Sequence, residues 1–253
     1  MPEILNISRD GRVLRIEMNR AEKRNALSEE LCRALAQALE DGDSDPAVGA
    51  ILLTANGKAF CAGMDLGEVE GAPPEDLAAV HDRLFTVGAR LDKPIVGAVG
   101  GAALGGGVGV VANCHIAIAS PDATFGLTEI RLGLWPFLIY RAVAAAIGDR
   151  RTAELALTGR IFGPGEAKEM GLVTEVAPDH EGRALEVARG LAAASPTAIR
   201  GGLRFVRETR GKGWETAGEI AGRMRGELFR SADFREGVRA FREKRAPKWP
   251  SLG

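Results

Sequence analysis

The sequence predicts an α/β protein in which a mostly parallel sheet is followed by a helical C-terminal region. In the first half of the chain, continuous apolar runs typical of buried parallel strands alternate with segments of helical periodicity. From about Phe137 onward the periodicity is predominantly helical, and Ser195-Pro196 interrupts it. We therefore expect a core of residues 1–195 and a helical segment of residues 196–253.

The predicted elements follow from local patterns, taken in chain order. A hairpin is expected around Asp10-Gly11, because alternating apolar and polar residues flank this turn dipeptide. A helix is expected after Ser28, a residue type that accepts hydrogen bonds from first-turn N–H groups. The further elements are a strand at 48–54, a loop at 55–73, a helix at 74–91, a strand at 94–99, a glycine-rich turn into a short helix, a strand at 115–119, and helices at 197–210, 214–229 and 232–243.

The composition is that of an ordinary globular protein, and it argues against several functional classes. Hydrophobic residues make up 45% of the 253 positions and charged residues 26%. The net charge of −1 gives no basic excess for nucleic-acid binding, and no apolar stretch has the length of a membrane span. An odd number of cysteines and an N-terminus unlike a secretory signal favour the reducing cytoplasm. Three histidines without clustered partners predict no metal site.

The charge is unevenly distributed between the two predicted regions. From Pro196 onward there are 14 Lys and Arg against 7 Asp and Glu, a local net charge of +7, which leaves −8 on the first 195 residues. A basic C-terminal segment can meet the phosphates of an anionic ligand. A solvated helical face beside an acidic neighbouring subunit explains the same charges, so both interpretations stay open.

Two loops carry the pattern that points most directly to chemistry. Residues 59–66 follow one predicted buried strand, and the glycine-rich residues 100–107 follow the next. Ligands bind at the carboxyl ends of parallel strands, and a glycine-rich turn into a helix exposes N–H groups. Two such turns side by side could aim two N–H donors at one developing oxyanion. Tight packing or a dinucleotide-binding turn are the alternatives, although neither a P-loop nor a G-x-G-x-x-G in the usual register is present.

Several motifs together resemble the crotonase superfamily, the enoyl-CoA hydratase/isomerase family. They occur in the family's order over essentially the whole chain, which makes the resemblance more specific than any single glycine loop. The motifs are Asn19-Arg20, Arg24-Asn25-Ala26-Leu27, residues 58–66, residues 103–107, Phe125-Gly126-Leu127-Thr128-Glu129, and residues 236–245.

The resemblance implies a spiral of ββα turns followed by helices that build a trimer or a dimer of trimers. It also implies that the backbone N–H groups of Met64 and Gly106 form an oxyanion hole for an acyl-CoA thioester. Coenzyme A is then part of the substrate, and no separate cofactor is expected. The residues implied to bind coenzyme A are Arg24, Ala26, Ala62, Asp65 and Leu66, together with Phe241 and Lys244 from the C-terminal helix of the same or a neighbouring subunit.

The sequence departs from the family's hydratases, which hold one water with two glutamates and a backbone N–H. Glu129 matches the second glutamate, but Gly109 stands at the position of the first. Phe137 replaces the glycine whose N–H contacts that water, and His115 replaces an aspartate. A single positioned carboxylate can remove an α-proton and return it at the γ-carbon. We therefore expect a 3-enoyl-CoA to 2-enoyl-CoA isomerase that uses Glu129.

Two other functions remain as alternatives. A hydratase or hydratase-lyase would need a second acid that lies outside the usual position. A non-catalytic CoA-binding protein is an alternative from a different class: the missing side chain at Gly109 favours it, and the presence of Glu129 argues against it. Exchange of α-protons would separate these functions, because a binding protein has no base to remove them.

A few further residues are candidates for catalytic groups. Glu68 and Glu70 follow the first glycine-containing loop and could supply a second carboxylate if that loop folds inward. His81 is expected to be a surface or packing residue, and His115 a satisfied core histidine. Tyr140, the single tyrosine, is no clear match for the tyrosine that hydratase-lyases use.

Overall fold

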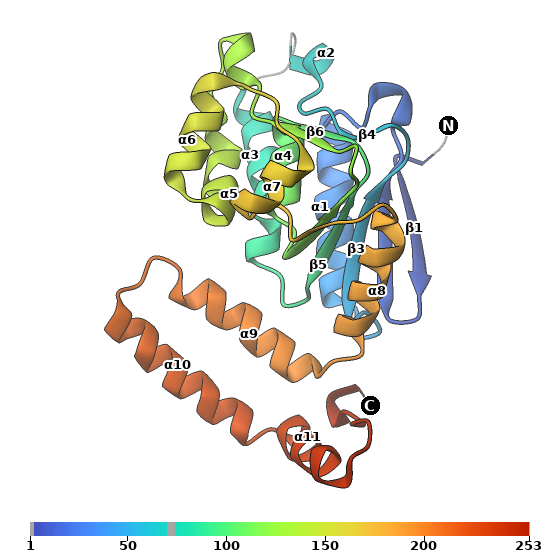
Figure 1. Cartoon of the computed structure of the whole chain (residues 1–253), viewed down its shortest axis with the longest axis vertical. Coiled ribbons are helices and arrows are strands. Elements are labelled where there is room, and N and C mark those ends of the chain that lie inside the picture. The colour runs from blue at the N-terminus through green and yellow to red at the C-terminus, as the bar shows by residue number, and fades with distance from the viewer. Residues whose placement is uncertain (1–2, 70–73, 253) are drawn as a thin grey trace.

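The computed structural model describes residues 3–69 and 74–252, and within them nine strands form two sheets (Figure 1). The larger sheet has the order β1-β2-β3-β5-β7-β9 and is parallel except for the β1–β2 hairpin. The smaller sheet, β4-β6-β8, is parallel throughout. The strands are β1 (Leu5–Asp10), β2 (Val13–Met18), β3 (Ala50–Ala55), β4 (Ala59–Cys61), β5 (Ile95–Val99), β6 (Ala102–Leu104), β7 (Ile116–Ala119), β8 (Thr124–Gly126) and β9 (Glu175–Val176).

The helices cover the sheets and then continue beyond them. The ones that bear on the candidate site are α1, α3, α4 and α5, which pack against one another on the same side of the larger sheet. The helices are α1 (Glu29–Ser44), α2 (Leu66–Val69), α3 (Pro74–Phe85), α4 (Gly106–Ala112), α5 (Phe137–Ile147), α6 (Asp149–Thr158), α7 (Pro164–Met170), α8 (His180–Ala192), α9 (Pro196–Thr209), α10 (Trp214–Phe229) and α11 (Ala232–Glu243).

The chain repeats one unit three times, and this repetition is the expected spiral of ββα turns. Each unit has a strand in the larger sheet, a short strand in the smaller sheet and then a helix. The successive units are β3-β4-α3, β5-β6-α4 and β7-β8-α5. Because each short strand pairs in parallel with the next, the loops that leave these strands meet at one edge. The α/β class and the spiral are thus confirmed.

Two apolar cores hold this architecture together. The larger core lies between one face of the larger sheet, the smaller sheet and the helices, with fully buried Leu31, Leu35 and Phe60 among its members. The smaller core lies under α8, whose buried face consists of Ala184, Ala188 and Ala192. These small side chains, four residues apart, let the helix lie close to the sheet.

Local expectations were met where the pattern was long, and they failed for short elements. The hairpin is present, and the Ser28 hydroxyl accepts a hydrogen bond from the N–H of Leu31 at 3.2 Å. The expected loop at 55–73 contains β4 and α2, because a three-residue strand is too short to show a periodicity. Helix α3 ends at Phe85 instead of residue 91, since the side-chain amide of Asn113 donates to the Phe85 carbonyl.

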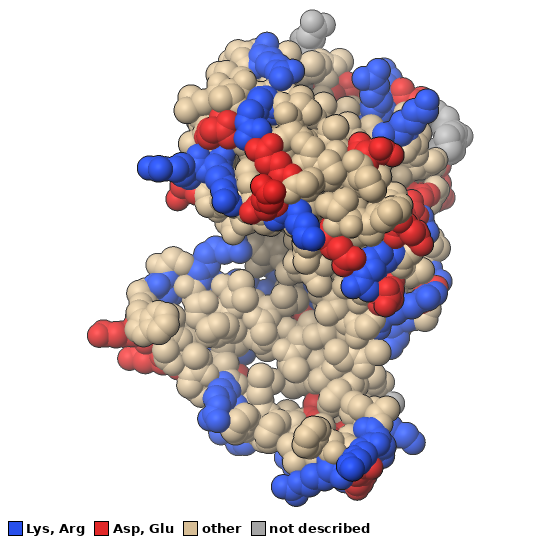
Figure 2. All heavy atoms as spheres, viewed as in Figure 1, with Lys and Arg blue, Asp and Glu red and all other residues tan. Residues whose placement is uncertain are grey.

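Helices α9, α10 and α11 extend from the body as an arm (Figure 1). Large apolar side chains stay exposed on this arm, including Trp214 at 93% and Phe241 at 85%. Figure 2 shows Lys and Arg gathered at the lower end of the arm, over α11. None of the helices described here combines the length and apolar character needed to cross a membrane.

Candidate active site

The two loops singled out in the sequence lie against each other at the carboxyl ends of β4 and β6. Gly63 has a φ of +94°, and a Cβ placed on it would lie 2.9 Å from the Leu104 carbonyl oxygen and 3.7 Å from the nitrogen of Gly106. Glycine is therefore required at position 63 for two reasons: its φ is positive, and the Leu104 backbone lies too close to leave room for a side chain. The Gly105 N–H donates to the Gly126 carbonyl at 2.8 Å, which ties the second loop to the end of β8.

The N–H groups of Met64 and Gly106 have the surroundings that an oxyanion hole requires. Gly106 is the first residue of α4, so its N–H has no partner within the helix. Leu27 donates to the Gly63 carbonyl and accepts from the Asp65 N–H, which turns the Met64 N–H away from this bridge. Among the described residues, neither N–H has an acceptor. Both groups border one cavity, where a thioester oxygen could accept from them.

The cavity beside these loops has a volume of about 440 Å³ and a largely apolar lining. Such a cavity suits an acyl chain, with a few polar groups to orient it. The lining residues are Leu27, Ala62, Gly63, Met64, Leu66, His81, Phe85, Gly105, Gly106, Thr128, Glu129, Leu132, Leu134, Trp135, Pro136, Phe137, Leu138 and Ile139.

Glu129 brings a carboxylate into this cavity. It begins a 3₁₀ turn directly after β8, and its Oε1 would lie 3.1 Å from a Cβ placed on Gly105. Its Oε2 is buried and has no hydrogen-bond partner among the described residues. Burial raises the pKa of this carboxyl above its ordinary value, because the charged form loses its hydration. A half-buried carboxylate with one oxygen free of partners, in a cavity that two N–H donors also border, is suited to proton transfer.

Side chains of neighbouring helices fill the space beside Gly109, which stands where the resemblance places the first glutamate of the hydratases. A Cβ on Gly109 would lie 2.5 Å from Cγ2 of Ile139 and 3.1 Å from Cδ1 of Phe85. Both of these side chains are buried. The space that a second carboxylate would need is therefore occupied by apolar groups of α5 and α3.

The backbone N–H of Phe137 is engaged as well. It donates to the Trp135 carbonyl at 2.8 Å across Pro136, whose φ of −76° and ψ of 51° are those of an inverse γ-turn. The Phe137 side chain is 75% exposed at the cavity. The space beside Gly109 is thus filled and the N–H of Phe137 is engaged, so neither position offers a group to hold a water in this cavity.

The residues expected to bind the nucleotide end of coenzyme A fall into two groups, and the first surrounds the Met64 loop. The Ala62 N–H donates to the Arg24 carbonyl at 3.0 Å, so Ala62 can offer a ligand only its carbonyl oxygen. The side chains of Arg24 and Leu66 are exposed beside them. Arg24, Ala26, Ala62, Asp65 and Leu66 are therefore brought together at one rim of the cavity.

Asp65 holds this rim together through Arg20. The guanidinium of Arg20 lies 2.6 Å from the Asp65 carboxylate and donates to the Ala26 carbonyl at 3.0 Å. The hydrogen bond from Arg20 lowers the pKa of Asp65. Within one chain, the Asp65 carboxylate thus joins the 24–27 loop to the loop that carries Met64.

Asn25 and Arg20 are structural residues that the sequence motifs contained but that were not singled out. Asn25 is fully buried with a φ of +52°, and its amide donates to the carbonyls of Asn56 and Ala59 at 2.9 Å. Its side-chain oxygen accepts from the N–H of Arg20. A polar Arg-Asn pair before an N-cap serine is a signal that could have found them, because asparagine tolerates positive φ.

Phe241 and Lys244, the second group, are not brought to this rim within one chain. They lie on or just after α11, at the opposite end of the molecule from α2 and β4 (Figure 1). Phe241 instead borders an apolar groove with Trp249 and Phe234. Any contact of these residues with a nucleotide at the Arg24 rim requires a second copy of the chain.

The structure places the remaining candidates as follows. His81 is buried and lines the cavity, so it is not a surface residue. His115 lies outside the cavity, and its Nδ1 accepts from the Ile95 N–H at 3.0 Å, but the residue is exposed, so the expectation of a core histidine is wrong. The exposed Glu68 accepts from the Glu29 N–H at 2.8 Å at the start of α1 and is not among the residues that line Glu129's cavity. Glu70 lies outside the described residues.

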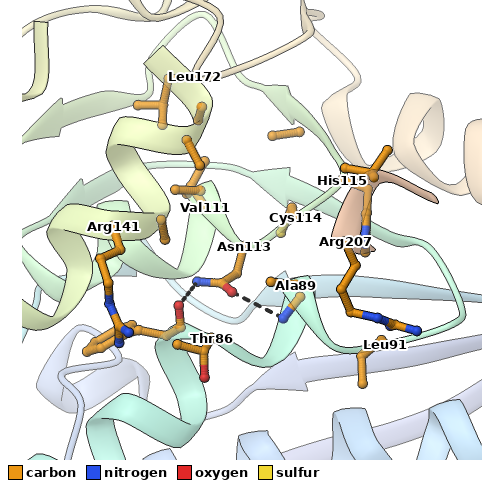
Figure 3. A pocket seen from close by; sticks show the side chains of 18 of the residues that line it. Thr86, Ala89, Leu91, Val111, Asn113, Cys114, His115, Arg141, Leu172 and Arg207 are labelled. Carbon is orange, nitrogen blue, oxygen red and sulfur yellow. Dashed lines mark hydrogen bonds between the residues drawn. The ribbon is translucent and has the colours of Figure 1, made fainter. Parts of the chain in front are cut away.

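A larger cavity of about 590 Å³ lies between the body and α9 and does not include Glu129 (Figure 3). Two of its three lining arginines are paired: Arg207 donates to the Arg90 carbonyl and to Asp92, and Arg141 pairs with Asp82. No Asp or Glu is present in the described lining of this cavity. The smaller cavity, which contains Glu129, is therefore the candidate active site.

Known proteins are similar to this chain along most of its length. The model of the family described as enoyl-CoA hydratase/isomerase matches residues 8–251. The enoyl-CoA hydratase EchA19 of Mycobacterium tuberculosis is 37% identical over 257 residues, which cover 96% of this chain and 95% of that protein. The hydroxycinnamoyl-CoA hydratase-lyase of Pseudomonas fluorescens is 37% identical over 209 residues, or 78% and 76%. A solved enoyl-CoA hydratase from Bacillus anthracis has a TM-score of 0.93 and 31% identity, covering 98% of this chain and 100% of that one.

Proposed function

Because this chain belongs to the enoyl-CoA hydratase/isomerase family of the crotonase superfamily, we propose that it moves the double bond of an enoyl-CoA from the 3-position to the 2-position. Glu129 is the acid–base group in this proposal. The observation that carries it is the filled space at Gly109, where Ile139 and Phe85 stand in place of a second carboxylate. Among the described residues that line the cavity, Glu129 is the only carboxylate.

The proposed reaction needs only three groups that border the cavity, namely two backbone N–H groups and one carboxylate. The thioester oxygen accepts hydrogen bonds from the N–H groups of Met64 and Gly106, and Glu129 removes a proton from the α-carbon. The electron pair of that C–H bond forms a dienolate whose negative charge rests on the oxygen. The protonated Glu129 then delivers its proton to the γ-carbon, the double bond moves to the 2-position, and the carboxylate is restored.

Hydration is the second candidate, and the names of the relatives favour it. EchA19 is named a hydratase and the Pseudomonas protein a hydratase-lyase. Addition of water across a double bond needs one group to activate the water and a source of the α-proton. With the Gly109 space filled and the Phe137 N–H engaged, the second group would have to come from another part of the cavity.

One experiment separates the two reactions. The purified protein is incubated in D₂O with matched 3-enoyl and 2-enoyl-CoA substrates, next to a Glu129→Gln variant. We expect deuterium at the α- and γ-carbons and interconversion of the two enoyl isomers, both lost in the variant. Rapid formation of 3-hydroxyacyl-CoA would contradict isomerisation and establish hydration. Tight CoA binding without any exchange would show a binding protein instead of an enzyme.

We further propose that residues 196–253 assemble the chain into a trimer or a hexamer. The support is the apolar surface left exposed on the arm, at Val206, Trp214, Phe229 and Phe241, which a single chain leaves in water. In such an assembly, Phe241 and Lys244 approach the nucleotide of a neighbour's substrate. Coenzyme A enters only as part of the substrate, and no separate cofactor or metal takes part in the proposed reaction.

A further inference from the structure

His81 is a buried titratable side chain of the candidate cavity that the proposed reaction does not use. It lies on α3 one turn before Phe85, and only 9% of its surface is exposed. The imidazole and the Phe85 ring are 5.8 Å apart between centroids, with 40° between their planes. No hydrogen bond links His81 to another described residue. An imidazole that lines a cavity without a protein partner depends on cavity water for its hydrogen bonds, and a bound acyl chain that displaces this water leaves its polar atoms uncompensated.

Phe85 fixes where His81 lies relative to the reacting atoms. The Phe85 Cζ would be 3.2 Å from a Cβ on Gly106, and its Cδ1 3.1 Å from one on Gly109. His81 therefore lies one helical turn of α3 away from the residue that packs on Gly106. A substrate group that meets His81 lies several bonds along the acyl chain and not at the thioester.

The charge state of His81 indicates the chemistry of that group. Burial lowers the pKa of the imidazole, and the charge of Glu29 opposes this only in part. A neutral imidazole offers one N–H donor and one nitrogen acceptor. A carboxylate on the acyl chain would share the cavity with Glu129, and two like charges in an apolar space repel strongly. A neutral hydroxyl or carbonyl group can hydrogen-bond to the imidazole and adds no second negative charge beside Glu129.

We propose that His81 is a specificity-determining residue, which hydrogen-bonds a neutral hydroxyl or carbonyl group on the distal part of the acyl chain. The inference rests on the proposed function, in that it takes the cavity as the acyl site. A purely aliphatic acyl chain leaves His81 dehydrated and unpaired, whereas a hydroxylated chain replaces the lost water. This difference selects for the hydroxylated acyl-CoA by about 10- to 100-fold in affinity.

Equilibrium binding tests the proposal independently of catalysis. Saturated acyl-CoAs of increasing length are each paired with the analogue in which a terminal hydroxyl replaces the terminal methyl group. We expect one length at which the wild type binds the hydroxylated member about 10- to 100-fold more tightly. In His81→Phe, which keeps an aromatic ring but removes both polar atoms, that ratio falls to about 1, and His81→Gln keeps part of it.

Leu138→Ala is the matched control, because Leu138 lines the same cavity and carries no polar atom. It changes the affinity for both members of a pair and leaves their ratio intact. A wild-type ratio near 1 at every length, or a ratio that His81→Phe leaves unchanged, overturns the proposal. Deuterium exchange on the same protein samples reports separately on Glu129, so a failure of the proposed reaction is distinguished from a failure of the His81 assignment.

Discussion

At the scale of single residues, the chemistry depends on how Glu129 is kept reactive. Its carboxylate is half-buried, and its Oε2 has no described partner, so no cation or N–H group at that oxygen stabilises the charge. Most other acidic side chains near the site are engaged, as Asp65 is with Arg20. Burial raises the pKa of Glu129 and outweighs a hydrogen bond from its own backbone N–H, which strengthens the carboxylate as a base once it is ionised.

This environment predicts opposite effects of Glu129→Gln on activity and stability. Proton exchange should fall by about 10²- to 10⁴-fold. Because the folded-state pKa lies above the ordinary 4.5, the wild type is most stable, relative to the variant, below pH 4.5 and loses that stability as the pH rises through the raised pKa. The neutral glutamine avoids this loss, so the variant should have the higher Tm at neutral pH.

Thermal unfolding of both proteins across this pH range, together with the pH profile of kcat/KM, checks the prediction. The acidic limb of the wild-type profile should lie above the ordinary pKa of a glutamate. Glu68→Gln is the control, because that carboxylate is exposed and outside the cavity. A Tm difference that is the same at every pH would show that Glu129 does not have a raised pKa.

At the scale of elements, the site is a junction of loops held by a few polar side chains. Arg20 joins the 24–27 loop to Asp65, and buried Asn25 joins the same loop to the carbonyls of Asn56 and Ala59. These bonds fix the segment that precedes Met64 without touching the cavity. The position of the Met64 N–H therefore depends on the 24–27 loop, since Leu27 is bonded to both neighbours of Met64.

The Arg20–Asp65 pair should consequently affect substrate binding more than the chemical step. Asp65→Asn should raise KM for an acyl-CoA about 3- to 10-fold, as expected for a pair worth on the order of 1 kcal/mol, and change kcat little. Arg20→Gln should have a similar effect, and the double variant should be no worse than either one. Steady-state kinetics of the four proteins measure the coupling. The exposed pair of Asp10 and Arg189 provides a control, and Asp10→Asn should leave KM unchanged.

At the scale of the whole molecule, the arm and the site lie at opposite ends of one chain (Figure 1). The arm nevertheless has an ordered end: Asp233 accepts hydrogen bonds from the hydroxyls of Ser195 and Ser251, both at 2.6 Å. These bonds join α11 and the C-terminal residues to the start of α9. The basic end of the arm is thus held in a defined place, from which it can serve a neighbouring copy but not its own cavity.

Mixed assemblies test this arrangement. Lys244→Glu should weaken acyl-CoA binding, and Glu129→Gln should abolish exchange. When the two variants are unfolded together and refolded, sites that combine Glu129 of one subunit with Lys244 of another should regain activity. Recovery should be absent when the two proteins are mixed without refolding. If co-refolding yields no more activity than the Lys244→Glu protein alone, Lys244 does not serve a neighbour's site.

Much of this protein could be predicted from local patterns. The hairpin, the N-cap at Ser28, the buried strands and the helices of the arm all lie close to where periodicity and turn chemistry placed them. The glycines of the two loops could also be identified from the sequence as marking tight turns, because glycine is the residue that tolerates a positive φ or a close backbone approach. Elements of three residues, such as β4 and β8, were not predicted, because three residues are too few to show a periodic pattern.

Only the tertiary structure decided what surrounds the reacting atoms. The absence of a side chain at Gly109 is visible in the sequence, but its filling by Ile139 and Phe85 depends on how α5 and α3 pack on α4. The placement of His81 in the cavity follows from the same packing, and so does the burial of Glu129. Local sequence sets backbone conformation over a few residues, whereas burial, pairing and pKa depend on neighbours that are distant in the chain.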